Sequence, residues 1–153
     1  MKINEMSICA RRNTERPVIP LADFSEKERS AALYADLSLS FNKFWLIKAN
    51  GSGSAVLDQY CDVLMKFLLV ASSHNMIDRF LITQEEIKQM QEKWQSKSFN
   101  SLYLIINQQL YNAYFKHQTS ALLHAWRMVL KLGVRDLGYS AAEIEKRYFE
   151  IFQ

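Results

Sequence analysis

Residues 55–72 read AVLDQYCDVLMKFLLVAS, a segment in which apolar side chains recur at steps of three and four positions. Val56, Tyr60, Val63 and Phe67 mark one such series, and further apolar residues lie beside it. This spacing is typical of an α-helix whose apolar surface covers most of its circumference. The segment therefore predicts a helix at the centre of the fold.

The sequence around this segment excludes most β folds. Residues 54–132 contain neither Gly nor Pro, and the whole chain of 153 residues has only four Gly and two Pro. Tight turns between strands usually need these residues, so a β-sandwich, a β-barrel or a glycine-looped nucleotide fold does not suit this stretch. With 49% hydrophobic residues, the chain is long enough to bury one core. We expect an all-α fold.

Capping signals divide the chain into helices. Ser25, Thr83 and Ser140 are each followed three residues later by Glu, which is the spacing of a capping box. Gly51 and Gly53 indicate a linker, and Gly133 is predicted to end a helix in the left-handed conformation. The result is a bundle of five or six helices, with segments at about 25–48, 55–72, 83–96, from 101, 120–132 and 140–153.

Residues 1–23 differ from the rest of the chain. They hold both prolines and a small basic cluster of Arg11, Arg12 and Arg16, and we find no helical periodicity in them. We expect a flexible or extended N-terminal arm there, followed by a single helical domain over residues 24–153. The basic cluster is expected to be solvated, with phosphate binding as the alternative.

Bulk properties favour a cytoplasmic protein. The formal charge of +3 is ordinary and gives no support to a dedicated nucleic-acid binder. The N-terminus lacks the apolar segment of a signal peptide, and no apolar run is long enough to span a membrane. Cys9 and Cys61 are too few for a disulfide framework, so a reducing compartment is expected.

The residues alone leave the chemistry open. Three scattered histidines and the absence of a glycine-rich phosphate loop give little support to nucleophilic catalysis. Carboxylates on facing helices could hold Mg²⁺, and Asp36, Asp58 and Asp62 lie on the first two long helices. However, Asp58, Asp62 and Lys66 follow one another at four-residue steps, which is also the pattern of a solvated salt-bridge stripe.

Three segments together resemble a known family. Residues 33–48 (LYADLSLSFNKFWLIK), residues 57–69 (LDQYCDVLMKFLL) and residues 132–148 (LGVRDLGYSAAEIEKRY) are similar, in order and separation, to the dimeric all-α dUTPases. These enzymes are relatives of the MazG-type nucleoside triphosphate pyrophosphatases. The resemblance covers residues 25–152. It implies a helical homodimer that binds a nucleoside triphosphate, holds Mg²⁺ between four carboxylates and releases pyrophosphate.

Carried over position by position, the resemblance implies a degraded metal site. Asp36 and Asp62 match the family's catalytic, metal-binding acids, and Asn42 and Lys48 match its nucleotide-binding positions. Leu39 and Gln59 stand where the family has its other two acids. Two of the four expected carboxylates are therefore missing, and Mg²⁺ binding is in doubt.

Three hypotheses follow. In the first, the chain is a dUTPase-like protein that is impaired as an enzyme and acts in nucleotide or partner binding. In the second, it is an active Mg²⁺-dependent diphosphatase for dUTP or a related nucleotide and uses Asp36, Asp62 and Asp58. In the third, it is a helical interaction module without a nucleotide site. If Asp36 and Asp62 do not face each other, the family hypothesis fails. One set of aromatic residues is expected in the core or at a dimer interface: Phe41, Phe44, Trp45, Tyr111, Tyr114 and Phe115.

Overall fold

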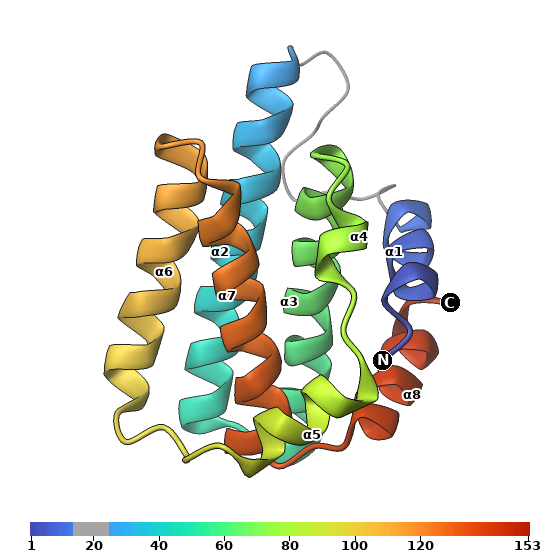
Figure 1. The fold of residues 1–153 in the computed structure, drawn as a ribbon, viewed down its shortest axis with the longest axis vertical. Helices are drawn as coiled ribbons and strands as arrows, with labels where there is room; N and C mark the ends of the chain where they lie inside the picture. The colour runs from blue at the N-terminus through green and yellow to red at the C-terminus, as the bar shows by residue number, and fades with distance from the viewer. Residues whose placement is uncertain (14–24) are drawn as a thin grey trace.

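The computed structural model describes residues 1–13 and 25–153, and every regular element in them is helical. The all-α prediction is confirmed. Two short helices, α1 and α4, were not expected. The elements are α1 (Ile3–Arg12), α2 (Glu26–Asn50), α3 (Gly53–Ser73), α4 (Ile77–Phe80), α5 (Gln84–Glu92), α6 (Phe99–Phe115), α7 (Thr119–Lys131), a π-helical turn η1 (Leu132–Asp136) and α8 (Ala141–Phe152) (Figure 1).

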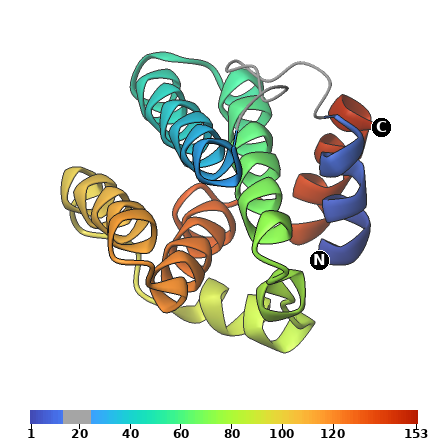
Figure 2. The same cartoon turned by 90° about the horizontal axis from the view of Figure 1, so that it is seen from above.

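Helix α3 lies in the middle of the bundle. Seen from above, α2, α6 and α7 lie on one side of it, and α1 and α8 lie on the other (Figure 2). It packs directly against α1, α2 and α8, and its side chains Tyr60, Val63 and Phe67 are fully buried. The broad apolar surface of residues 55–72 therefore needs neighbours on both sides, which places α3 at the centre.

The three capping signals mark helix starts as expected. The Ser25 hydroxyl accepts a hydrogen bond from the Glu28 amide at 3.2 Å. Complete reciprocal capping boxes form at Thr83 with Glu86 and at Ser140 with Glu143. These local bonds satisfy amides that the first helical turn leaves unpaired, so they fix the starts of α2, α5 and α8.

The prediction of an extended arm is wrong for residues 3–12, which form α1. Ile3, Met6 and Ala10 are buried and share one face of this helix, which packs against α3 and α8. The Tyr148 hydroxyl donates to the Met6 carbonyl at 2.9 Å and ties α8 to α1. No periodic signal is evident in the sequence of this segment, because its buried face is only a few residues long. So short a helix is stable only when it packs against distant helices. Both prolines and Arg16 lie outside the described residues.

Gly133 does not end its helix in the left-handed conformation. It lies within η1, where the ring of Tyr60 packs against its Cα, so that a Cβ at this position would overlap the Tyr60 ring and hydroxyl. The Tyr60 hydroxyl donates to the Val129 carbonyl at 2.8 Å. Among the glycines, it is Gly138 that adopts a positive φ, at 77°, in the turn before α8. Gly133 is therefore required by close packing and not by its backbone angle.

None of the helices in the described part of the chain combines the length and the apolar character that crossing a membrane would require.

Candidate functional site

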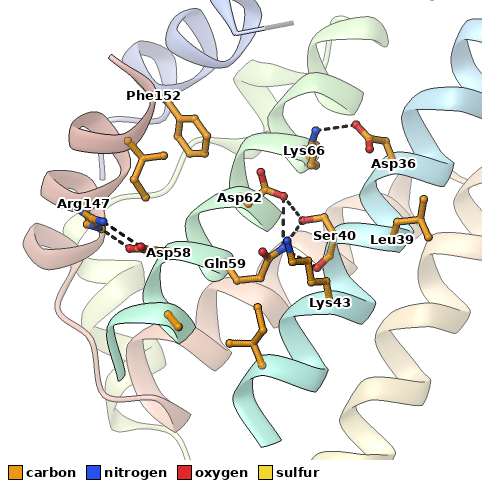
Figure 3. Close-up of a pocket in the computed structure, with 13 residues that line it drawn as sticks. Asp36, Leu39, Ser40, Lys43, Asp58, Gln59, Asp62, Lys66, Arg147 and Phe152 are labelled. Carbon is orange, nitrogen blue, oxygen red and sulfur yellow. Dashed lines mark hydrogen bonds and ion pairs between the residues drawn. The ribbon is translucent and has the colours of Figure 1, made fainter. Parts of the chain in front are cut away.

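A cavity of about 770 Å³ opens between α2, α3 and α8 (Figure 3). Helix α2 contributes Asp36, Ser40 and Lys43, which follow one another at steps of four and three and so share one helix face. Helix α3 contributes Asp58, Gln59, Asp62 and Lys66 at similar steps, and α8 contributes Arg147. The structure thus brings Asp36 and Asp62 to the same cavity, which keeps the family hypothesis open.

Asp36 is paired with Lys66. The Lys66 ammonium lies 2.7 Å from Asp36 Oδ2, and the side chains of Asp36 and Lys66 are only 8% and 13% exposed. A carboxylate this far from water needs a partner charge, and here a lysine on the facing helix supplies it. The positive charge that neutralises Asp36 is therefore part of the protein.

Asp62 is held by two neutral side chains. Ser40 Oγ donates to Asp62 Oδ2 at 2.5 Å. Gln59 Nε2 donates to the Ser40 carbonyl and hydroxyl, each at 3.1 Å, and lies 3.5 Å from Asp62 Oδ2. Gln59 on α3 thus donates hydrogen bonds from its amide nitrogen to Ser40 on α2. A carboxylate at position 59 could not form these bonds, because it has no proton to donate.

Asp58 faces α8. Arg147 binds it through two nitrogens, with Nε 2.6 Å from Oδ1 and Nη2 3.0 Å from Oδ2, and also reaches Glu150 at 3.2 Å. The hydrogen bond from Arg147 lowers the pKa of Asp58 and raises the pKa of the guanidinium. Asp58 therefore pairs with a residue of α8, and Lys66 pairs with a residue of α2. The alternative of a salt-bridge stripe along α3 is wrong.

The residues of this cavity do not fit Mg²⁺. Magnesium prefers octahedral oxygen ligands and is usually bound through one or two carboxylates with waters, but Leu39 offers no ligand atom and the Gln59 amide nitrogen is turned toward Ser40. The two matching carboxylates are bonded to Lys66 and Ser40. Across residues 1–13 and 25–153, no three His, Cys, Asp or Glu side chains form a group that could hold a metal.

Asn42 and Lys48 are not brought to the cavity. Asn42 Oδ1 accepts a hydrogen bond from the Tyr103 hydroxyl at 2.7 Å, and the Lys48 ammonium lies 3.6 Å from the centre of the Phe99 ring. Both partners belong to α6, so these residues lie on a different face of α2 from Asp36. Ser40, Lys43 and Arg147 were missed from the sequence, although Ser40 and Lys43 share the helix face of Asp36.

The lowered pKa of Asp58 predicts an acid-sensitive contribution to stability. Because the folded-state pKa lies below the unfolded value of about 3.9, the contribution is complete above that pH and is lost as the pH falls through the folded-state pKa. We expect Arg147→Met to make the fall in the free energy of unfolding below about pH 4 less steep. Urea titrations across this range measure it.

The control is Asp78→Asn, an exposed carboxylate with no ion pair to any residue of the described chain. The pKa values of Glu86 and Glu143 are also lowered, but these residues are unchanged in both variants. Their contributions to the pH dependence of the free energy of unfolding therefore cancel when a variant is compared with the wild type. An equal acid slope in wild type and Arg147→Met would show that the pair contributes nothing to the pH dependence.

Comparison with known proteins leaves the family open, since no family model, no curated protein and no solved structure matches the chain.

Proposed function

We propose that the chain is a dUTPase-like protein of the all-α nucleoside triphosphate pyrophosphatase type that binds a nucleotide without hydrolysing it. The observation that carries this proposal is the buried ion pair of Asp36 with Lys66. Hydrolysis in the family uses Mg²⁺ held by carboxylates, whereas here an ammonium already neutralises one of the two that remain. Metal-activated water is therefore not expected at this site.

Binding of a phosphate group is supported by the charges at the cavity. Lys43 lines its rim, is exposed, and forms no ion pair with any described residue. Its ammonium is free to meet a phosphate, while Lys66 and Arg147 are already paired. The volume of about 770 Å³ also lies within the range of small-molecule sites.

Calorimetry tests this proposal. We expect dUTP or a related nucleotide to bind with the same affinity in Mg²⁺ and in EDTA, because the protein supplies the positive charge. Lys43→Gln is expected to weaken binding by about tenfold, the loss of one charge-assisted hydrogen bond.

The matched control is Lys88→Gln, a change to an exposed lysine on α5 that does not line this cavity. Nucleotide binding that requires Mg²⁺ would instead support the hypothesis of an active diphosphatase. If no nucleotide gave a heat of binding, only the hypothesis of a helical interaction module would remain.

The dimer implied by the resemblance has a candidate surface on α6. This helix, residues 99–115, contains no charged residue, and four of its large apolar side chains are well exposed: Leu104, Ile105, Tyr111 and Phe115. Exposed apolar side chains without charges can meet a second copy of themselves without repulsion. We propose that two copies of the chain pair through this face.

The prediction is a solution mass of twice 17.9 kDa at micromolar concentration, measured by light scattering. Leu104→Glu should shift the mass to that of one chain, because it places a charge within the proposed contact, at a side chain that is 65% exposed. Leu81→Glu is the control, since Leu81 is also exposed but lies outside α6. A monomeric wild type would rule out this dimer.

A further inference from the structure

Trp94 belongs to the loop between α5 and α6, and this loop runs along the bottom of the molecule in Figure 1. Its side chain is 90% exposed, although the backbone on either side of it is held in place. The Lys93 carbonyl accepts a hydrogen bond from Arg135 Nε at 2.7 Å, and Ser96 donates to Asp136 from its amide at 2.8 Å and from its hydroxyl at 3.0 Å. A fixed loop therefore presents a free indole ring to solvent.

The anchor of this loop is built by η1. Asp136 belongs to this π-helical turn, its side chain is completely buried, and its carboxylate also accepts a bond from the Lys131 ammonium at 3.1 Å. Turns of this kind are uncommon and occur often at functional sites. The anchoring bonds span about forty residues of sequence, so the position of Trp94 is set by the tertiary structure.

A second cavity, of about 590 Å³, lies beside Trp94 and shares no residue with the first. Its apolar wall is formed by Met90, Leu102 and Met128. Its charged residues are Glu86, Lys93, Arg127 and Lys131.

The charges around this second cavity do not balance. Glu86 pairs with Arg127 at 3.1 Å, and Asp136 pairs with Lys131. Among the residues that the structure places, neither the Lys93 ammonium nor the Arg135 guanidinium has a carboxylate within ion-pair distance. The rim beside Trp94 therefore carries an excess of positive charge and attracts an anionic group.

We propose that Trp94, Lys93 and the cavity beside them form a second binding site, which takes a mononucleotide. The base stacks on the exposed Trp94 ring, and the phosphate meets the unpaired Lys93 ammonium. The volume of about 590 Å³ suits one small molecule, so a single nucleotide fits better than a strand. This site is independent of the function proposed for the first cavity.

Tryptophan fluorescence tests the proposal on the whole chain. Trp126 is fully buried and Trp45 is half-buried, so quenching by an added nucleotide reports mainly on Trp94. We expect AMP or UMP to quench the emission to saturation. Trp94→Ala should remove this quenching and weaken binding in calorimetry by about tenfold or more. Since Trp94 is almost fully exposed, this variant should remain folded.

Two further variants locate the ligand. Lys93→Gln should weaken binding by roughly fivefold while preserving the backbone carbonyl that holds Arg135, and Lys88→Gln should have no effect. The proposal would be overturned if Trp94→Ala and Lys93→Gln left the affinity for AMP and UMP unchanged. It would also be overturned if only Lys43→Gln removed the binding. Inorganic phosphate binding as tightly as AMP, or an oligo(dT) strand whose affinity rises with its length, would overturn it as well.

Discussion

Replacing Lys66 with Met is expected to lower the free energy of unfolding by about 3 kcal/mol, because it leaves the Asp36 carboxylate buried without its partner. Methionine fills nearly the same volume, so the loss is electrostatic and not a cavity effect. Urea denaturation of the purified variant at neutral pH measures the change.

Two variants show whether the loss comes from the pair. Asp36→Asn combined with Lys66→Met removes both charges and should recover most of the stability, since a buried ion pair is worth little compared with a neutral replacement. Lys43→Met, at an exposed and unpaired lysine of the same cavity, should change the free energy of unfolding by less than about 0.5 kcal/mol. If Lys66→Met were as mild as Lys43→Met, Asp36 would not depend on Lys66.

Gly133→Ala is expected to cost about 3 kcal/mol, near the upper end for overpacking, because the added methyl group would overlap the Tyr60 ring. Tyr60 cannot move aside easily, since it is fully buried and its hydroxyl is bonded to the Val129 carbonyl. Thermal or urea unfolding provides the measurement.

Gly53→Ala is the matched control, because a methyl group at Gly53, the first residue of α3, meets no atom within 4 Å. It should be neutral or slightly stabilising, since alanine restricts the unfolded chain more than glycine. Equal stabilities of the Gly133→Ala and Gly53→Ala variants would contradict the close contact at Gly133 and the account of η1.

The parts of the fold that could be predicted are those that local interactions determine. Ser25, Thr83 and Ser140 lie within three residues of the amides that they cap, so the sequence pattern is sufficient to place these helix starts. Helix α1 was missed because Ile3 and Met6 form only a short apolar face, and its stability comes from helices far along the chain. The role of Gly133 depends on Tyr60, which no local pattern connects to it.

The candidate site shows the same limit. The family resemblance implied that Asp36 and Asp62 lie on facing helices, and both line the cavity. It could not show that Lys66 pairs with Asp36 across thirty residues instead of with Asp62 one turn away, or that Arg147 reaches Asp58. These pairings depend on how the helices face one another. The same is true of the bonds from Arg135 and Asp136 that hold the loop of Trp94.

Phosphorus NMR of dUTP mixed with the protein, in Mg²⁺ and in EDTA, tests the central claim most directly because one spectrum reports both binding and hydrolysis. We predict that the phosphate signals shift or broaden to the same extent in both samples, and that their total intensity stays constant. Signals of dUMP and pyrophosphate that appear in the Mg²⁺ sample, or dUTP signals that the protein leaves unchanged, would contradict nucleotide binding without hydrolysis.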